Sequence, residues 1–316
     1  MNNPFPYSDS NKRYYTFDYY TRSTFGGKCA KITLDGGFTC PNRDGSRGFG
    51  GCTFCSERGS GDFCAGPSLS ISEQFETQKQ MMQKKWENAR FLAYFQAHTN
   101  TYAPLTRLKA LYEEALSQEG VVGLNIATRA DCLEDEVVEY LHELSKRTAL
   151  TVELGLQSIH DVTAKRVNRC HTTEEFLRGY EKLKGLDVCI HIINGLPGED
   201  HGMMMQTARA VADLRPKFLK IHLLHVIEGS VLAEQYRRGE FEAMSLEDYV
   251  ATVCDQLEIL PPDTVLGRVT GDGAADTLIA PLWSKKKLVV MNEIDKELVR
   301  RGSYQGICYN CTKMSP

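Results

Sequence analysis

Three cysteines in one glycine-rich segment are the residues whose types and spacing point most directly to chemistry. Cys40, Cys52 and Cys55 lie in the segment TCPNRDGSRGFGGCTFC. Thiolates bind iron–sulfur clusters and zinc, and glycine lets a loop fold closely around a bulky inorganic group. Four cysteines usually hold one cluster, and Cys64, nine residues after Cys55, is a candidate for the fourth. We favour a cluster in which one iron keeps an open position for a substrate or cofactor.

Two alternatives remain for these cysteines. A Cys-x2-Cys zinc knuckle needs a second ligand pair at a defined spacing, and Cys29 and Cys64 do not match a common zinc pattern. The cysteines could also bind no metal. A second Cys-x2-Cys pair, Cys308 and Cys311, lies near the end of the chain. It could serve a second cluster, zinc or a redox relay, but no partner pair is apparent and we assign it no role.

Composition narrows the class of protein. The chain has 316 residues, of which 42% are hydrophobic and 25% charged, as in an ordinary globular protein. No apolar run approaches the length of a membrane span, and the N-terminus lacks a secretory h-region. The eleven cysteines are an odd number in a chain too large to need disulfides. We therefore expect reduced thiols in a cytoplasmic protein.

The net charge gives no general attraction to nucleic acid. It is −4, with a pI near 6.1, so only a local basic patch could contact phosphates. The runs at 285–287 and 300–301 are candidates for such contacts. The alternative is that they are solvated helix faces.

The sequence predicts that strands and helices alternate along most of the chain, and these elements would position the cysteines. Short apolar runs predict strands at 29–34, 90–96, 122–127, 150–156, 188–193 and 218–224. Helical spacing predicts helices at 72–86, 105–117, 135–146, 173–184 and 203–214. This alternation predicts parallel strands with right-handed crossovers. The expected fold is α/β, a partial (β/α)6 TIM-like barrel, and a doubly wound sheet is the alternative.

The regular alternation of strands and helices ends at about residue 226. Helices are expected at 231–238 and 246–259, a seventh strand at 265–269 and a final helix at 287–301. We therefore predict an irregular N-terminal arm at 1–26, a barrel core at 27–226 and a C-terminal α/β extension at 227–316 that covers the barrel.

The cysteine segment and three further motifs resemble the radical S-adenosylmethionine (SAM) superfamily. The superfamily commonly has Cys-x3-Cys-x2-Cys, whereas eleven residues separate Cys40 from Cys52 here. ELGLQS at 153–158, VNRCH at 167–171 and NGLPGE at 194–199 resemble motifs of the elongator catalytic subunit and oxygen-independent coproporphyrinogen oxidase branch. Together with TNTYAP at 99–104, they are most similar to the subfamily that contains the YhcC and YtqA proteins. The resemblance covers roughly residues 14–307.

That resemblance implies a radical SAM core and its cofactors. Cys40, Cys52 and Cys55 would bind a [4Fe–4S] cluster, and SAM would chelate the fourth iron and be cleaved to a 5′-deoxyadenosyl radical. Glu153 and Gln157 would point together from one strand, unless they form a structural hydrogen-bonded pair. Arg169 would meet the SAM carboxylate, unless its role is structural. The superfamily's Gly-Gly-Glu is absent, so Thr99 and Asn100 would replace it. The cofactor-binding candidates are Phe54, Thr99, Asn100, Glu153, Gln157, Arg169, His191 and Gly195.

The resemblance also suggests a substrate, less specifically. Related proteins indicate conversion of carboxymethylaminomethyluridine to aminomethyluridine at the tRNA wobble position, with flavodoxin or ferredoxin as electron donor. Lys220 and His222 share one strand face and are candidates for substrate binding or catalysis, unless they are only strand ends with solvated or salt-bridged tips. The alternatives are a radical SAM enzyme acting on a small metabolite or peptide, and a non-catalytic, metal-stabilised binding protein. The oligomeric state is not predicted.

Overall fold

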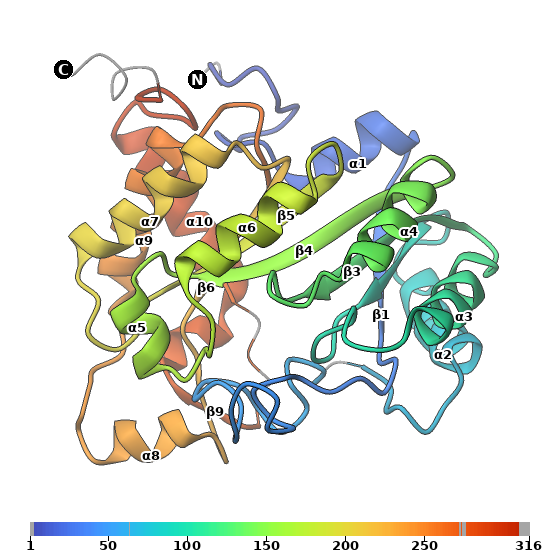
Figure 1. The fold of residues 1–316 in the computed structure, drawn as a ribbon. Coiled ribbons are helices and arrows are strands. Elements are labelled where there is room, and N and C mark those ends of the chain that lie inside the picture. Colours follow the sequence, from blue (N-terminus) through green and yellow to red (C-terminus); the bar gives the residue numbers. More distant parts are fainter. Residues whose placement is uncertain (1–2, 63, 272, 274–275, 310–316) are drawn as a thin grey trace. The chain divides into compact units, whose positions relative to one another are not determined.

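The strand order of the sheet matches the order of the strands in the chain. The computed structural model describes residues 3–62, 64–271, 273 and 276–309. The order in the sheet is β1-β2-β3-β4-β5-β6-β8 (Figure 1). A doubly wound sheet reverses its order at a switch point, so that alternative is wrong. A sequential order is that of a (β/α) barrel, and the predicted partial barrel is confirmed. The strands are β1 (Cys29–Leu34), β2 (Arg90–Phe95), β3 (Val121–Thr128), β4 (Ala149–Gln157), β5 (Asp187–Asn194), β6 (Phe218–Leu223) and β8 (Val265–Arg268).

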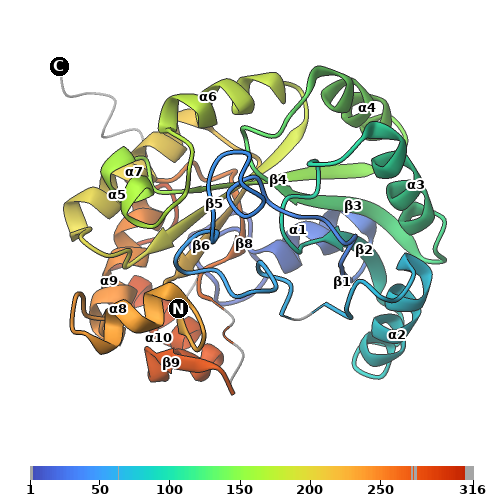
Figure 2. The ribbon, with the colours of Figure 1, turned by 60° about the horizontal axis from the view of Figure 1, so that its bottom comes forward.

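Amphipathic helices follow the strands. Figure 2 shows α2, α3 and α4 along the outer side of β1, β2 and β3. Each buries one apolar stripe, such as Leu108, Tyr112 and Ala115 of α3. Among the described residues, no helix combines the length and apolar character needed to cross a membrane. These helices are α2 (Ile71–Gln83), α3 (Leu105–Leu116), α4 (Asp135–Ser145), α5 (Asp161–Arg166), α6 (Thr173–Lys182) and α7 (His201–Leu214).

The chain divides into two compact units. Residues 21–155 and 168–188 form the first, which we call the cysteine unit. Its strands β1 to β4 form parallel ladders. Its core contains Ile32, Phe95 and Leu124, which are fully buried. A capping box of Thr172 and Glu175 starts α6, which fixes where the preceding loop ends.

Residues 1–20, 156–167 and 189–316 form the second, which we call the C-terminal unit. Its strands β5, β6 and β8 form parallel ladders. The short strand β7 (Val226–Ile227) pairs antiparallel with β9 (Leu278–Ala280). The remaining elements are α8 (Val231–Arg237), α9 (Leu246–Ile259), the 3-10 helix η1 (Leu282–Lys285) and α10 (Lys287–Arg300). This division differs from the predicted domains, which stay a prediction.

The N-terminal segment differs from the expected irregular arm. Helix α1 (Phe17–Phe25) forms within it. Tyr15, Phe17 and Tyr20 pack against a buried cluster of Cys189, Phe218 and Val265. Burial of aromatic rings stabilises this helix, whose nine residues are too few for a stable isolated helix. The arm prediction is therefore wrong for residues 17–25.

Candidate functional site

One asparagine links two of the three predicted cluster cysteines within the cysteine unit. The Asn42 side chain contacts Cys40 Sγ at 2.8 Å and Cys52 Sγ at 3.4 Å. The backbone turn from Cys52 to Cys55 is closed by an N–H···O bond of 3.0 Å, and the thiols of these two cysteines share a hydrogen bond. The three sulfur atoms therefore lie close together.

The electrostatics of this place favour a thiolate. The hydrogen bond from Cys55 holds the pKa of the Cys52 thiol well below its usual range, against the opposing effect of burial. The positive charge of Arg169, whose Nη1 lies 3.9 Å from Cys52 Sγ, acts in the same direction. Because thiolates are the form that binds metal, Cys52 is ready to act as a ligand.

The VNRCH motif lies directly against the cysteine loop. Asn168 and Cys170 have positive φ angles of 53° and 58°, a conformation that glycine adopts more readily. Asn168 Nδ2 donates to the carbonyls of Phe49 and Gly51 at 2.9 and 2.7 Å. A side chain at Gly48 would collide with Cys170 Sγ. This close fit shows why a small residue stands at position 48.

Arg169 is held in place by backbone groups. Its Nη2 donates to the carbonyl of Gly155 at 2.6 Å. Its own carbonyl accepts from Arg129 Nη1 at 2.8 Å. Arg129 in turn pairs with Asp131 through two bonds of 2.9 and 2.8 Å. Burial together with the charges of Arg169 and Arg129 lowers the pKa of His171 to about 3, so this histidine is neutral near pH 7.

The predicted replacement for the Gly-Gly-Glu motif is also buried here. Asn100 donates two hydrogen bonds to the carbonyl of Ala127, one from its backbone N at 3.1 Å and one from its side-chain Nδ2 at 2.7 Å. The carbonyl of Asn100 accepts from the Tyr112 hydroxyl. The Thr99 N–H donates to the Thr39 carbonyl at 3.2 Å. The segment is thus fixed by its backbone and by one amide group.

Five buried side-chain atoms in the cysteine unit have no hydrogen-bond partner among the described residues: Thr53 Oγ1, His98 Nδ1, Asn100 Oδ1, Arg169 Nε and His171 Nε2. Two of them, the acceptor Asn100 Oδ1 and the donor Arg169 Nε, belong to residues that the sequence predicts to bind SAM. A buried polar group without a partner is costly, so such atoms commonly mark a place for a ligand. One free acceptor and one free donor suit the ammonium and the carboxylate of an amino acid.

Glu153 has protein partners in the cysteine unit. Its carboxylate pairs with Lys31 Nζ at 2.8 Å and accepts from Asn125 Nδ2 at 2.9 Å. It is only 1% exposed. These contacts favour the structural alternative for Glu153.

In the C-terminal unit, two of the predicted motifs are tied together. The Ser158 hydroxyl donates to the Glu199 carboxylate, which joins ELGLQS to NGLPGE. Gly195 has φ 85° and its N–H donates to Met204 Sδ at 3.3 Å. Gln157, the last residue of β4, has φ 69°. The shared orientation of Glu153 and Gln157 stays a prediction.

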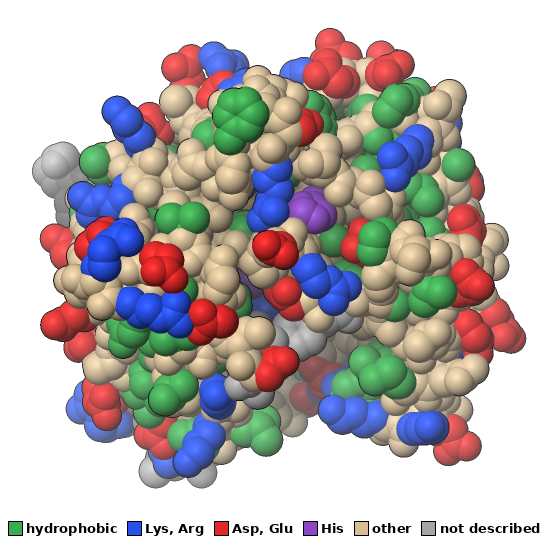
Figure 3. Space-filling model, turned by 90° about the horizontal axis from the view of Figure 1, so that it is seen from below, with side chains coloured by type: hydrophobic (Ala, Val, Ile, Leu, Met, Phe, Trp, Pro, Cys, Tyr) green, Lys and Arg blue, Asp and Glu red, His purple; other side chains and the backbone are tan. Residues whose placement is uncertain are grey.

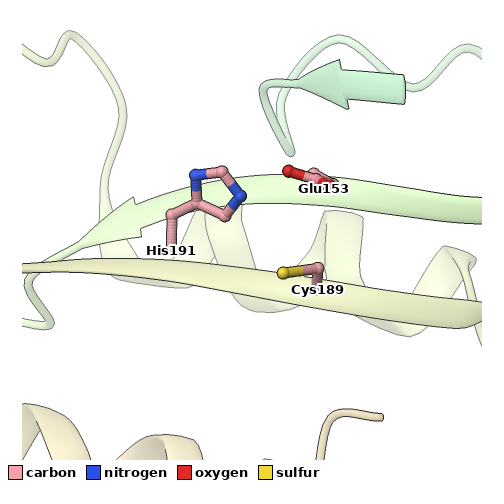
Figure 4. A group of neighbouring side chains, drawn as sticks. All are labelled: Glu153, Cys189 and His191. Carbon is pink, nitrogen blue, oxygen red and sulfur yellow. The ribbon is translucent and has the colours of Figure 1, made fainter. Parts of the chain in front are cut away.

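Basic side chains lie on one face of β5 and β6 in the same unit. Figure 4 shows Cys189 and His191 on the same side of β5; the third labelled residue, Glu153, belongs to β4. The rings of His191 and His222 are 5.1 Å apart. The register pairs His191 with Lys220, which is only 6% exposed. Burial of Lys220 argues against a solvated strand end and leaves the salt-bridged alternative open.

The remaining candidate residues have contacts that are common in folded proteins. The Cys64 thiol bonds Thr33, and burial raises its pKa to about 11. Phe54 is half-buried, and Cys308 packs against α7 and α9 residues. Cys311 lies outside the described residues. Arg300 and Arg301 both pair with Glu297, which favours the solvated-face alternative for this run.

Sequence reasoning missed the residues that connect the motifs. Lys31 and Asn125 gave no spacing signal, because their partner Glu153 lies on another strand. Asn42 was detectable only as a polar residue two positions after Cys40. The others needed the strand register.

Comparison with known proteins gives matches over most of the chain. Residues 40–211 match the model of the radical SAM superfamily, and residues 216–300 match that of the radical SAM C-terminal domain. The chain is 52% identical over 308 residues to YtqA of Bacillus subtilis (strain 168), covering 97% of this chain and 96% of that protein.

More distant similarities include a curated relative that matches half of the chain and a solved structure. It is 32% identical over 164 residues to a tRNA uridine(34) acetyltransferase of Methanocaldococcus infernus, covering 50% of this chain and 30% of that protein. The solved structure of the archaeal Elp3 of the same species, with an N-terminal deletion, has a TM-score of 0.66 and 20% identity. That match covers 91% of this chain and 68% of the other, and it shows the same fold.

Proposed function

The chain belongs to the radical SAM superfamily, and we propose that it modifies the wobble uridine of tRNA, converting carboxymethylaminomethyluridine to aminomethyluridine. Enzymes of this family use a [4Fe–4S] cluster and SAM. When bound, this pair supplies reductive cleavage of SAM to a 5′-deoxyadenosyl radical, which abstracts hydrogen from the substrate. The protein's part is to hold the reactants and exclude water.

The cysteine unit has a donor set that fits the cluster. Cys40, Cys52 and Cys55 are the residues that would hold it, because Asn42 and the Cys52–Cys55 hydrogen bond bring the three thiols together. Thiolates are the usual ligands of such clusters. Cys64 is not needed as a fourth ligand, since its thiol bonds Thr33.

The unpartnered pair of atoms carries the proposal for SAM. Asn100 Oδ1 would accept from the SAM ammonium, and Arg169 Nε would donate to the SAM carboxylate, which satisfies both buried atoms. Thr99 would line the same place, and Phe54 beside Cys55 would contact SAM from the loop. We propose Glu153, Gln157, His191 and Gly195 as further SAM contacts.

The substrate part of the proposal rests on relatives and on one buried cation. The similar acetyltransferase is named for uridine 34 of tRNA. The leaving carboxymethyl group carries a carboxylate, and Lys220, beside His222 on β6, would pair with it. Flavodoxin or ferredoxin would supply the electron.

A census of tRNA nucleosides tests the substrate directly. Bulk tRNA from a strain lacking this protein should accumulate carboxymethylaminomethyluridine and lose aminomethyluridine, as measured by mass spectrometry. A plasmid copy should restore the parent pattern, whereas a Cys52→Ala copy should not. If no wobble uridine changes, the tRNA substrate is refuted, and a small metabolite or peptide becomes the better candidate.

A further inference from the structure

Phe49 is exposed on the loop that carries the cluster cysteines. It is 77% exposed, more than any other large hydrophobic side chain among the described residues. A single exposed apolar side chain is common on protein surfaces. Phe49 differs because it lies in the long segment between Cys40 and Cys52, where the superfamily's common spacing has only a short one.

The backbone around Phe49 is rigidly held. Its carbonyl accepts from Asn168 Nδ2 at 2.9 Å, and Phe49 forms an antiparallel bridge with Asp44. The Gly48 N–H donates to the Pro41 carbonyl at 3.3 Å. The ring lies over Gly45, where a side chain would collide with it. A ring fixed in this way loses little conformational entropy when a ligand stacks on it.

The same contacts connect the ring to the cluster cysteines. Asn168 bonds the Phe49 carbonyl through its side chain and accepts from Asn42 Nδ2 at 2.9 Å through its own carbonyl. Asn42 contacts Cys40 and Cys52. Two asparagines therefore separate the exposed ring from the place where the radical would form.

Three arginines of the cysteine unit bring positive charge to the surrounding loops. Arg43 donates to the carbonyls of Ser56 and Glu57, Arg58 to that of Cys64, and Arg107 to those of Gly36 and Gly37. Within the described part of the chain, none of the three pairs with a carboxylate. Acidic and basic side chains are intermixed on the face in Figure 3, so local guanidinium groups, not a broad field, would attract phosphates.

We propose that Phe49 is a stacking platform for an unpaired RNA base next to the modified nucleotide. The proposal rests on the proposed function and adds a recognition residue to it. Aromatic rings bind single-stranded nucleic acid by stacking on bases, and adjacent cations contact the backbone. Phe49 supplies the ring, and Arg43, whose guanidinium lies against Gly51 two residues from Phe49, supplies the adjacent cation. An anticodon loop, whose bases can be unstacked, offers such a base.

RNA binding by ring-changing variants tests this proposal. The probe is a 17-nucleotide RNA hairpin with a seven-nucleotide loop and uridine at the wobble position, and its Kd is measured by fluorescence anisotropy with the cluster-loaded protein. We expect Phe49→Ala and Phe49→Leu to weaken binding about 5- to 150-fold, the range for loss of one stacked base. Phe49→Tyr keeps the ring and should stay within about twofold. Met81→Ala, which removes another exposed apolar side chain, should bind like the parent.

The outcomes separate this proposal from the proposed function. If the parent protein does not bind the hairpin in a salt-dependent manner, the RNA substrate itself is refuted, and the stacking role with it. If the parent binds and Phe49→Ala, with full iron content, binds within twofold of it, only the stacking role is refuted. If Phe49→Ala binds RNA normally but is reduced poorly by flavodoxin and normally by dithionite, the ring serves a protein partner and the proposal is overturned.

Discussion

Replacement of Arg169 should weaken SAM binding by an amount that depends on the side chain that replaces it. In the structure, Nη2 is used by the Gly155 carbonyl at 2.6 Å and Nη1 lies 3.9 Å from Cys52 Sγ. Nε is the buried donor without a partner. One charge-assisted hydrogen bond to the SAM carboxylate is worth about 1.5–3 kcal/mol. Arg169→Gln should therefore raise the Kd for SAM about 10- to 150-fold.

Arg169→Lys distinguishes charge from geometry. Lysine keeps the positive charge but cannot hold the Gly155 carbonyl and a carboxylate with the fixed fork of a guanidinium. Its Kd for SAM should lie between those of the parent and Arg169→Gln. Equilibrium binding to anaerobically reconstituted protein measures these values, and the visible absorption band controls for an intact cluster. A Kd for SAM within twofold of the parent in Arg169→Gln would refute the assignment of Nε to the carboxylate.

Three further predictions follow from buried contacts of the cysteine unit. Asn42→Ala loses the contacts with Cys40, Cys52 and the Asn168 carbonyl. This variant should have a free energy of unfolding lower by about 2 kcal/mol and should release iron faster to a chelator. Urea-unfolding and chelation curves identical to those of the parent would contradict this prediction. Tyr112→Phe removes the hydroxyl that donates to the Asn100 carbonyl. This variant should lower the free energy of unfolding, measured with urea, by about 1–2 kcal/mol and should raise the Kd for SAM. If neither the free energy of unfolding nor the Kd changes, Asn100 does not need this hydrogen bond. His171 takes up a proton below about pH 6.5 when unfolded but only near pH 3 when folded; the free energy of unfolding should therefore fall by about 2 kcal/mol between pH 6.5 and 5, and His171→Gln should lack this part of the slope.

The elements of the fold were largely predictable from the sequence. The expected strands agree with β1 to β6 and β8 to within one or two residues, because short, β-branched runs buried on both faces differ clearly from the amphipathic helices between them. Helix α1 was missed because aromatic packing against Phe218 stabilises it, and local periodicity does not report such packing.

The site was predictable in its ligands but not in its connections. Three cysteines on one loop converge for reasons that the sequence shows. The contact of Asn42 with Asn168, by contrast, joins residues 126 positions apart and depends on the folded loop. The left-handed conformation of Gln157 also arises where β4 ends, and no residue type at that position signals it. Sequence patterns therefore identify the cysteines as candidate ligands, whereas the side chains that support them can be identified only in the folded structure.

Formation of 5′-deoxyadenosine is the measurement that tests the central claim most directly. Anaerobically reconstituted protein should show about four irons per chain and should convert SAM to 5′-deoxyadenosine when reduced with dithionite. Cys52→Ala should abolish the product, and Cys64→Ala should retain it, because Cys64 bonds Thr33 instead of the cluster. Full iron content without any 5′-deoxyadenosine, or a cysteine site that takes up zinc and no iron, would contradict the account.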